Sequence, residues 1–594
     1  MHVEIYAFRQ LEWYHGNPSL FYKEIGFFIY QKGEINIMEK YHKKISEVIN
    51  LSFPGLDVIF TTPPDSSLGD ISLPCFAFAK TLRKSPNMIA DELKSKLSNL
   101  EFVEKIESND GYLNFFIKKA ILFEDVITGI LCMKDEYGSS KSGIGKQALV
   151  EHTSINPNAS PHVGRARNAL IGDSIVRLLR FEGYFVDVHY FVNDIGKQIA
   201  MLLLGAMDKV SVSFHDLLGI YIDINNKVNE NPELEKEVFD LLYKLENGDD
   251  NIRSMFRKLV NVCIDGQTSM LGELGIKYNT FDYESDYIYS QTTSKLLDEF
   301  KKTGRLEEDA EGRLVLNQAE YKLPMKAPYL VLTRKDKTSL YPLRDIAYTI
   351  DKVKANADMN IIVLGEDQKL YFRQVCSALD LLGYRTPSSV HYSFVLLAEG
   401  KMATRKGNVV LLEDFMREAT SKASVEIEKR HGHVDVNTAK AIGYGAVKYA
   451  ILRASNDKNV VFDWESALSF EGDSGPYLQY SLARINSIFR NYGEALPEEI
   501  DFSALQNNHE IDLVLELANF PATVKTALKE LSPHVIANYV YGLTKKFSVF
   551  YHYNSVLNAN NENLKMARLA LMAAVRQVIL NCFELLGIEP VEEM

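Results

Sequence analysis

The chain has 594 residues, of which 46% are hydrophobic and 24% charged, and its net charge is −13. Single cores stop growing at roughly 250–300 residues, so this length predicts several domains, and the composition is that of an ordinary globular protein. A membrane protein is not expected, because the apolar runs are shorter than the roughly 18 residues of a spanning helix and no signal-peptide pattern is present.

Residues 1–37 are rich in aromatic side chains, and we expect them to be a possible N-terminal extension. Met38 then begins MEKYHKKISEVI, whose pattern is that of an amphipathic helix. We expect removal of residues 1–37 to leave the fold and activity intact.

The stretch that follows predicts a small α/β unit. Helices are expected from Pro74 to Lys80 and from Ser85 to Leu97, and residues 111–117 alternate like a half-buried strand. Residues 137–146, YGSSKSGIGK, are rich in glycine, serine and lysine. We interpret them as a linker to the next domain.

A nucleotide site is indicated between residues 148 and 196. A short strand, 149–152, precedes a turn that contains Pro157 and Pro161, and a helix is expected from Ala166 to Phe181. His162 and Gly164 then lie at the helix N-terminus, where unpaired N–H groups suit phosphates. An isolated His-x-Gly is more often an ordinary loop, so other signals must decide.

Further strands are expected at 186–191, 361–364 and 392–397, alternating with helices, which predicts a parallel sheet. Ligands of such sheets bind at the carboxyl ends of the strands. Residues 200–330 are expected to be an insertion of helices and loops, without a recognisable editing site.

A second nucleotide signal is the loop KMATRKG, residues 401–407, after an apolar run from Phe394 to Ala398. Lys401, Arg405 and Lys406 supply three cations that can fold over a triphosphate. Taken alone, such a loop is more often a solvated face. Beyond Asp463 the apolar spacing is helical almost throughout, which predicts a helix bundle.

HVGR and KMATR together resemble the His-x-Gly-His and Lys-Met-Ser-Lys-Ser signatures of class I aminoacyl-tRNA synthetases. The resemblance to arginyl-tRNA synthetases extends over about residues 38–594. Five stretches carry it: LPCFAFAKTLRKSPNMIADEL (73–93), VEHTSINPN with HVGRARNALIGDS, YPLRDIAYTIDK (341–352), KMATRKGN, and FEGDSGPYLQYSLARINSIFR (470–490).

The resemblance implies a multidomain α/β protein with a Rossmann-like parallel-sheet catalytic core, a small N-terminal α/β domain and a C-terminal all-α bundle. The expected divisions are an N-terminal tRNA-contacting domain at 38–135, a catalytic domain at 146–460 with the insertion at about 200–330, and an anticodon-binding domain at 461–594.

It also implies an arginine–tRNA ligase that uses ATP with Mg²⁺ as a substrate complex, with no tightly bound cofactor and no metal site of its own. Arginine's guanidinium needs carboxylates and planar acceptors. The residues that match the family's arginine site are Glu151 and Asn156 for the amino end, with Tyr341 and Asp345 towards the side chain. For Asp345 alone, a pair with Arg344 or a capping role is the alternative.

The expected roles of the signature residues follow from their charge and position. The expected catalytic set is His162, Gly164, Arg165, Lys401, Arg405 and Lys406. ATP contacts are expected from Pro157, His162, Gly164, Lys401, Met402 and Thr404. Exposed tyrosines of the bundle, such as Tyr539, Tyr541, Tyr551 or Tyr553, are expected to stack on tRNA bases.

Two departures from the family pattern affect the signatures. Arg165 replaces the second histidine, and Ala403 and Thr404 replace the serine and second lysine. In arginyl enzymes a lysine just before the first signature can substitute, but Ala159 stands there. Compensation then comes from Arg165, Arg405 or Lys406, or is absent.

The expected partners are tRNA(Arg), L-arginine and ATP, with no membrane and a monomeric state. Five scattered cysteines without a Cys-x-x-Cys pair favour a reducing cytoplasm. The acidic net charge does not favour a nucleic-acid partner, although phosphate contacts need only a few basic residues. The alternatives are another class I synthetase or nucleotidyltransferase, and a catalytically impaired paralogue that binds tRNA or acts in regulation.

Overall fold

The computed structural model describes residues 37–594 except 62, 64–67, 98–99, 398–409 and 433–434. Residues 1–36, and with them the proposed extension, lie outside the described residues. The chain divides into two compact units. The first contains the residues up to Lys141 with Arg484–Lys525 and Gly542–Asn581, and the second contains Ser142–Ala483, Thr526–Tyr541 and Cys582–Met594.

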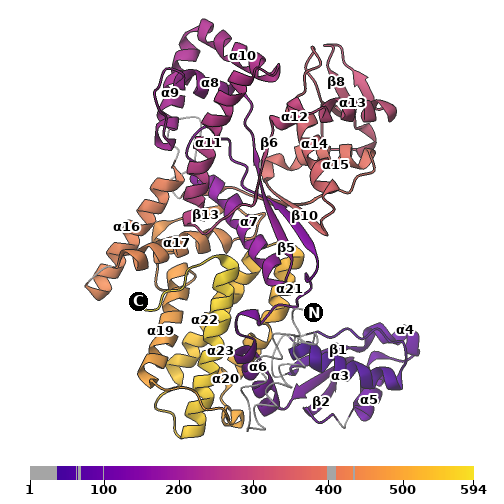
Figure 1. The fold of residues 1–594 in the computed structure, drawn as a ribbon. Helices are drawn as coiled ribbons and strands as arrows, with labels where there is room; N and C mark the ends of the chain where they lie inside the picture. Colours follow the sequence, from indigo (N-terminus) through magenta and orange to yellow (C-terminus); the bar gives the residue numbers. More distant parts are fainter. Residues whose placement is uncertain (1–36, 62, 64–67, 98–99, 398–409, 433–434) are drawn as a thin grey trace, which may run out of the picture. The chain divides into compact units, whose positions relative to one another are not determined.

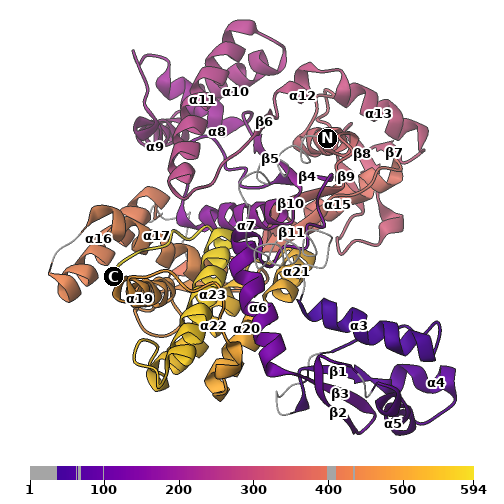
Figure 2. The same ribbon diagram turned by 60° about the horizontal axis from the view of Figure 1, so that its bottom comes forward.

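The N-terminal part of the first unit is a three-stranded antiparallel sheet in the order β1-β3-β2. Its strands are β1 (Ile71–Pro74), β2 (Val103–Asn109) and β3 (Tyr112–Ile117), and its helices include α3 (Ile37–Ser52), α4 (Ala79–Leu82) and α5 (Pro86–Lys96) (Figure 2). The expected helix from Pro74 is wrong at its start, because Pro74 ends β1 and a 3₁₀ turn, Cys75–Phe78, precedes α4.

The C-terminal part of the chain is helical, as its apolar spacing predicts. Its helices are α19 (Gly475–Tyr492), α20 (Asn508–Ala518), α21 (Phe520–Glu530), α22 (His534–Tyr553) and α23 (Glu562–Leu586). In the first unit, α6 (Lys119–Met133) contacts α20. A buried ion pair in this unit joins Arg568 Nε to Glu510 Oε1 at 2.8 Å.

Helix α23 is long and apolar enough to cross a membrane by length and composition. The expectation that no segment reaches this length is therefore wrong for α23. However, 72% of its apolar window is buried inside the protein. A mostly buried apolar helix is also what the core of a helix bundle contains.

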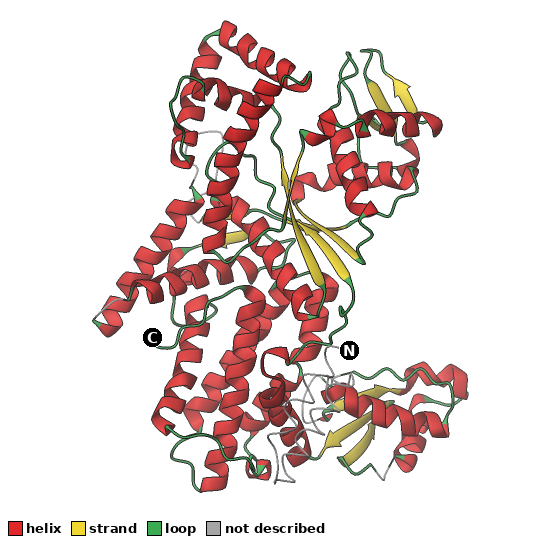
Figure 3. Cartoon of the chain, viewed as in Figure 1, coloured by secondary structure: helices red, strands yellow, loops and turns green. Residues whose placement is uncertain are grey.

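The second unit is built around a five-stranded parallel sheet in the order β11-β10-β4-β5-β6 (Figures 1 and 3). The strands are β4 (Gln147–Glu151), β5 (Phe185–Val192), β6 (Thr280–Tyr283), β10 (Met359–Gly365) and β11 (Ser388–Tyr392). Helix α7 (Val163–Phe181) connects β4 to β5, whereas β10 pairs with the other side of β4. The carboxyl ends of β4 and β10 therefore meet where the strand order reverses, the expected place for a ligand.

Two expectations about this sheet are wrong. Strand β6 lies inside the stretch 200–330 expected to be an insertion, yet it pairs with β5 as part of the core sheet. The run 392–397 is not one strand, because the chain leaves the sheet after Tyr392, and β12 (Val395–Leu397) pairs instead with β13 (Val460–Phe462).

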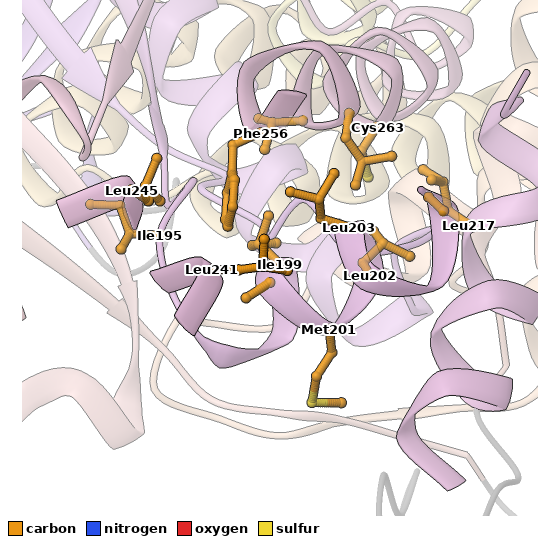
Figure 4. Packing of buried hydrophobic residues seen from close by; sticks show 14 of the residues in the cluster. Ile195, Ile199, Met201, Leu202, Leu203, Leu217, Leu241, Leu245, Phe256 and Cys263 are labelled. Carbon is orange, nitrogen blue, oxygen red and sulfur yellow. The ribbon is translucent and has the colours of Figure 1, made fainter. Parts of the chain in front are cut away.

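The rest of the insertion forms two groups of elements. The first is helical and consists of α8 (Lys197–Ala206), α9 (Phe214–Glu230), α10 (Pro232–Glu246) and α11 (Asp250–Glu273), whose buried side chains meet in one core (Figure 4). The second contains α12 (Asp286–Tyr289), α13 (Thr292–Lys302), and the antiparallel strands β7 (Leu306–Glu308), β8 (Leu314–Asn317) and β9 (Tyr329–Val331).

Helices α14 (Tyr341–Lys354) and α15 (Lys369–Leu381) pack on this second group (Figure 1). After β12 follow α16 (Leu412–His431), α17 (Val436–Leu452) and, after β13, α18 (Trp464–Ala467).

Candidate active site

The turn after β4 has an unusual backbone. Thr153 and Ser154 have φ angles of 77° and 44°, a left-handed conformation that non-glycine residues rarely adopt. Asn168 of α7 holds this turn, since its Oδ1 accepts from the Thr153 N–H at 2.6 Å and its Nδ2 donates to the Val363 carbonyl at 2.9 Å. The amide therefore ties the turn to β10, and strain of this kind is typical of functional sites.

Buried side chains from other elements support the same turn. Gln267 of α11 is fully buried and donates through Nε2 to the carbonyls of Asn156, at 3.2 Å, and Ala159, at 2.8 Å. Tyr190 of β5 donates to Gln267 Oε1 at 2.9 Å and accepts from the Ile155 N–H at 3.1 Å. The insertion thus shapes the nucleotide turn, a role that no local sequence pattern indicates.

The first signature lies at the helix N-terminus, although α7 begins at Val163 rather than Ala166. His162 is the N-cap residue and is half-buried, and Arg165 is exposed. Burial, followed by the nearby charge of Arg165, lowers the pKa of His162 to about 4. Its Nδ1 has no hydrogen-bond partner among the described residues. His162 is therefore a neutral imidazole at the N-terminus of α7. Val163 N and Arg165 N are already bonded there, to the carbonyls of Val410 and His162, but the partial positive charge of the helix end still suits phosphate.

The second signature lies outside the described residues, which includes Lys401, Met402, Ala403, Thr404, Arg405 and Lys406. Both flanks of the loop nevertheless lie against α7. On the far side, Val163 N donates to Val410 O at 3.1 Å, and Leu412 N donates to Pro161 O at 2.8 Å. On the near side, Arg167 Nη1 donates to Ser393 O at 2.6 Å. Segments between about 226 and 251 residues apart in the chain therefore meet at the start of one helix.

Arg167 is fully buried and links α7 to two loops. Besides Ser393, its guanidinium donates to the carbonyls of Lys458, at 2.7 Å, and Ser455, at 2.9 Å. Guanidinium is the one side chain with enough donors in a fixed plane to satisfy several carbonyls together. Arg167 therefore fixes the entry to β12, the strand that precedes the second signature.

The residues expected to hold the arginine side chain lie on α14. Tyr341 begins this helix and is 54% exposed, and Asp345 lies one turn later and is partly buried. Tyr371 of α15 donates its hydroxyl to Asp345 Oδ2 at 2.5 Å, and its ring lies 5.4 Å from that of Tyr341. Helices α14 and α15 thus bring two aromatic rings and a carboxylate together.

Asp345 neither pairs with Arg344 nor caps the helix. Arg344 is buried and forms an ion pair with Glu284 at 2.7 Å. Burial, followed by the charge of Glu284, raises the pKa of Asp345 to about 7. Within the described residues this carboxylate has no ion-pair partner. A bound guanidinium would supply the missing cation and stabilise the charged form.

Glu151 and Asn156 lie at opposite ends of the strained turn. Glu151 is the last residue of β4, is 5% exposed, and forms an ion pair with Lys352 of α14. Asn156 is exposed, with its Nδ2 3.5 Å from Gln198 Oε1, and the adjacent Pro157 is buried. The strand end and α14 thus place Glu151 near Asp345, whose pKa its charge also raises.

The sequence analysis missed Glu284, Tyr371, Lys352 and Gln267. Lys352 had a detectable signal, because Tyr341, Asp345, Tyr348 and Lys352 follow the 4-3-4 spacing of one helix face. The other three come from separate elements, and only the fold brings them to the site.

The expectation that Tyr539 is an exposed stacking residue is wrong, since it is 7% exposed. Tyr541 is partly buried, whereas Tyr551 and Tyr553 are 38% and 68% exposed. Tyr553 stacks on the ring of His509 at 5.2 Å. In the described part of the chain, no group of three or more acidic, histidine or cysteine side chains could hold a metal ion.

Comparisons with known proteins match nearly the whole chain. Residues 126–464 match the family model for the catalytic domain of class I (R) tRNA synthetases, 478–594 the DALR anticodon binding domain, and 39–117 the arginyl tRNA synthetase N-terminal domain.

Individual relatives give the same result. The arginine–tRNA ligase of Methanococcus aeolicus is 37% identical over 94% of this chain and 99% of the relative, and that of Clostridium perfringens is 36% identical over 93% and 99%. The structure of Thermus thermophilus arginyl-tRNA synthetase superimposes with a TM-score of 0.79 at 27% identity, covering 94% of this chain and all of that one.

Proposed function

The chain belongs to the arginyl-tRNA synthetases of class I, and we propose how its residues activate L-arginine with ATP and transfer it to the 3′ end of tRNA(Arg). AMP and pyrophosphate are the other products. The carboxylate of arginine attacks the α-phosphate of ATP in line, pyrophosphate leaves, and the ribose of the terminal tRNA nucleotide then takes the arginyl group from the adenylate. These reaction steps require no protein nucleophile, so catalysis consists of positioning and charge stabilisation.

In this proposal ATP enters as its Mg²⁺ complex and binds at the start of α7. His162 and Gly164, with Pro157 behind them, contact the nucleotide, and Arg165 faces the phosphates. Support comes from the neutral, half-buried imidazole at the N-cap and from the partial positive charge of the α7 N-terminus.

Lys401, Met402, Thr404, Arg405 and Lys406 cover the phosphates from the second loop, in this proposal. The attachment of both loop flanks to α7 supports it. Thr404 stands where the family signature has its second lysine, and Ala159 cannot replace that charge. We assign the compensation to Arg165, Arg405 or Lys406.

The observation that carries the substrate assignment is the carboxylate of Asp345, which has no ion-pair partner among the described residues, accepts a hydrogen bond from Tyr371 and lies near Glu284 and Glu151. Its neighbours suit a planar cation, with Asp345 and Tyr341 towards the guanidinium and Glu151 and Asn156 towards the amino end. A neutral analogue such as citrulline would leave the carboxylate unpaired, so strong discrimination needs no editing site.

For tRNA we propose an N-terminal contact domain at 38–135, a catalytic domain at 146–460 and an anticodon-binding domain at 461–594. The matches to the N-terminal and anticodon-binding family models support this division. Tyr553, rather than the buried Tyr539, is the better candidate for stacking on a base. We propose that the protein acts as a monomer in the cytoplasm.

The test is arginine-dependent exchange of pyrophosphate into ATP, measured with and without tRNA(Arg), with lysine and citrulline as controls. Exchange with arginine, but not with lysine or citrulline, supports the proposal. The resemblance to arginyl-tRNA synthetases implies that exchange needs tRNA(Arg), so a requirement for tRNA would support that mechanism. Absence of exchange under both conditions, with tRNA still bound, would favour an impaired paralogue instead.

A further inference from the structure

Lys352 is a buried lysine that the proposed reaction leaves without a role. It lies on α14 in the same stripe as Tyr341 and Asp345, seven residues after Asp345, and it is 3% exposed. Burying an ammonium group is costly unless it is paired. The position of Lys352 next to the substrate pocket, rather than in a scaffold core, calls for a functional explanation.

Among the described residues, the ammonium group of Lys352 contacts a single carboxylate. Nζ pairs with Oε2 of Glu151 and lies 4.3 Å from the centre of the Tyr348 ring. Tyr348 is held in turn by a hydrogen bond to Asp282 Oδ2 at 3.0 Å and by stacking on Phe191 at 4.3 Å. The ammonium group of Lys352 therefore lies between a carboxylate and an aromatic ring that is itself held in place.

This ion pair uses only one of the two carboxylate oxygens of Glu151. Lys352 takes Oε2, whereas Oε1 has no hydrogen-bond partner in the part of the chain that the structure describes. A carboxylate can accept bonds on both oxygens. Oε1 therefore remains available to a second cation, at the carboxyl end of a central strand.

The internal cations of α14 determine which carboxylates remain for substrate. Arg344 pairs with Glu284, and Lys352 pairs with one oxygen of Glu151. Asp345 lies between them on the same helix and has no ion-pair partner in the described part of the chain. Arginine carries two cationic groups. The pocket offers the carboxylate of Asp345 to one of them, and the oxygen of Glu151 that Lys352 does not contact to the other.

We propose that Lys352 is a positioning residue for substrate. By holding Glu151 through Oε2, it presents Oε1 to the α-ammonium group while Asp345 receives the guanidinium, and so fixes the orientation in which arginine enters. The inference rests on the proposed arginine-activating function and deepens it. Lys352 itself does not touch the reacting atoms.

The test uses Lys352→Met, which keeps the apolar stem and removes the charge, and Lys352→Arg, which keeps a cation. Lys354→Met is the matched control, because Lys354 is an exposed lysine two residues further along the same helix. The assay is tRNA-dependent pyrophosphate exchange. The probe is 5-guanidinopentanoate, which is arginine without its α-amino group, used as a competitive inhibitor.

We expect Lys352→Met to raise the KM for arginine by about 10- to 100-fold, the range for loss of a charge-assisted contact, and the KM for ATP by less than about twofold. The inhibition constant of 5-guanidinopentanoate should not change, because that compound does not use Glu151. Lys352→Arg should restore most of the affinity for arginine, and Lys354→Met should resemble the unmodified protein. A parallel rise of KM and the inhibition constant would overturn the proposal, since it would indicate general loss of the pocket.

A second pair of variants covers the case in which Lys352→Met alone does not fold. The pair is Glu151→Gln alone and Glu151→Gln combined with Lys352→Met. The Gln substitution removes the carboxylate that Lys352→Met by itself would leave without its cation. If Lys352 acts only through Glu151, the two should have the same KM for arginine. A further large loss in the double variant would refute the assignment. Absence of exchange in the unmodified protein would instead refute the proposed function.

Discussion

Arginine use should depend on pH through the ionisation of Asp345. Its folded-state pKa is raised to about 7, mainly by burial and next by the charge of Glu284. The ionised form, which a guanidinium requires, then falls from about 90% at pH 8 to about 10% at pH 6. We expect kcat/KM for arginine to fall about tenfold over this interval, because it reports the state of the pocket before arginine binds.

Under saturating arginine, kcat should change much less. The bound guanidinium favours the charged carboxylate and lowers the pKa of Asp345 below the tested range. The guanidinium of arginine stays charged over this range, and loss of the α-ammonium proton at its alkaline end would lower kcat/KM as the pH rises. Titration of the substrate therefore cannot produce the predicted increase of kcat/KM with pH. The assay is initial-rate pyrophosphate exchange from pH 6 to 8 at saturating ATP and tRNA.

The control must separate Asp345 from its titratable surroundings. His189 is a second titratable group in this unit: burial lowers its pKa, but the hydrogen bond to Asp282 and the charge of that carboxylate outweigh burial, so the net shift of the pKa is upwards. Asp345→Asn removes the carboxyl group and leaves His189 in place. The variant should be much less active, and its remaining kcat/KM should lose the tenfold slope. A flat profile in the unmodified protein, or an unchanged slope in Asp345→Asn, would refute the reasoning.

Three further predictions concern the signatures and the bundle. In Arg167→Lys the charge is kept, but a lysine cannot reach the three loop carbonyls that Arg167 binds, so the rate of pyrophosphate exchange should fall by about 100-fold with little change in the KM for arginine. An unaltered rate would contradict the positioning role of Arg167. Lys401→Ala should slow adenylate formation by about 10²- to 10³-fold in single-turnover measurements, the range for loss of one transition-state donor, and unchanged activation would remove Lys401 from the mechanism. Tyr553→Ala should raise the KM for tRNA by about 5- to 150-fold, the equivalent of one stacked base, without altering the KM for arginine; equal charging of tRNA by both proteins would exclude this contact.

The local spacing of apolar and turn residues in the sequence was enough to predict much of the fold. Alternation of strands and helices predicts the parallel sheet, and the 3.6-residue spacing beyond Asp463 predicts the helical C-terminal region. The turn residues before α7 place His162 at a helix N-terminus, because Asn and Pro end one element and free N–H groups begin the next. The four-residue spacing of Tyr341 and Asp345 likewise puts both side chains on one helix face, which the structure confirms.

Strands whose formation depends on pairing with distant segments could not be predicted from local sequence pattern. Strand β6 is four residues long, and only pairing with β5 makes it part of the core sheet. The run through Ser393 and Phe394 has strand-like composition, but Arg167 binds its carbonyls and the chain continues as β12 on a different partner. Strand identity here is decided by long-range hydrogen bonds.

The sequence by itself determined the chemistry available to this protein, namely the two nucleotide signatures and the acidic residues suited to arginine. The tertiary structure decided how those charges are shared. Glu284 and Glu151 are engaged by Arg344 and Lys352, whereas Asp345 has no ion-pair partner among the residues that the structure describes. That partition depends on which side chains become buried together, since burial removes the water that would otherwise compensate each charge separately.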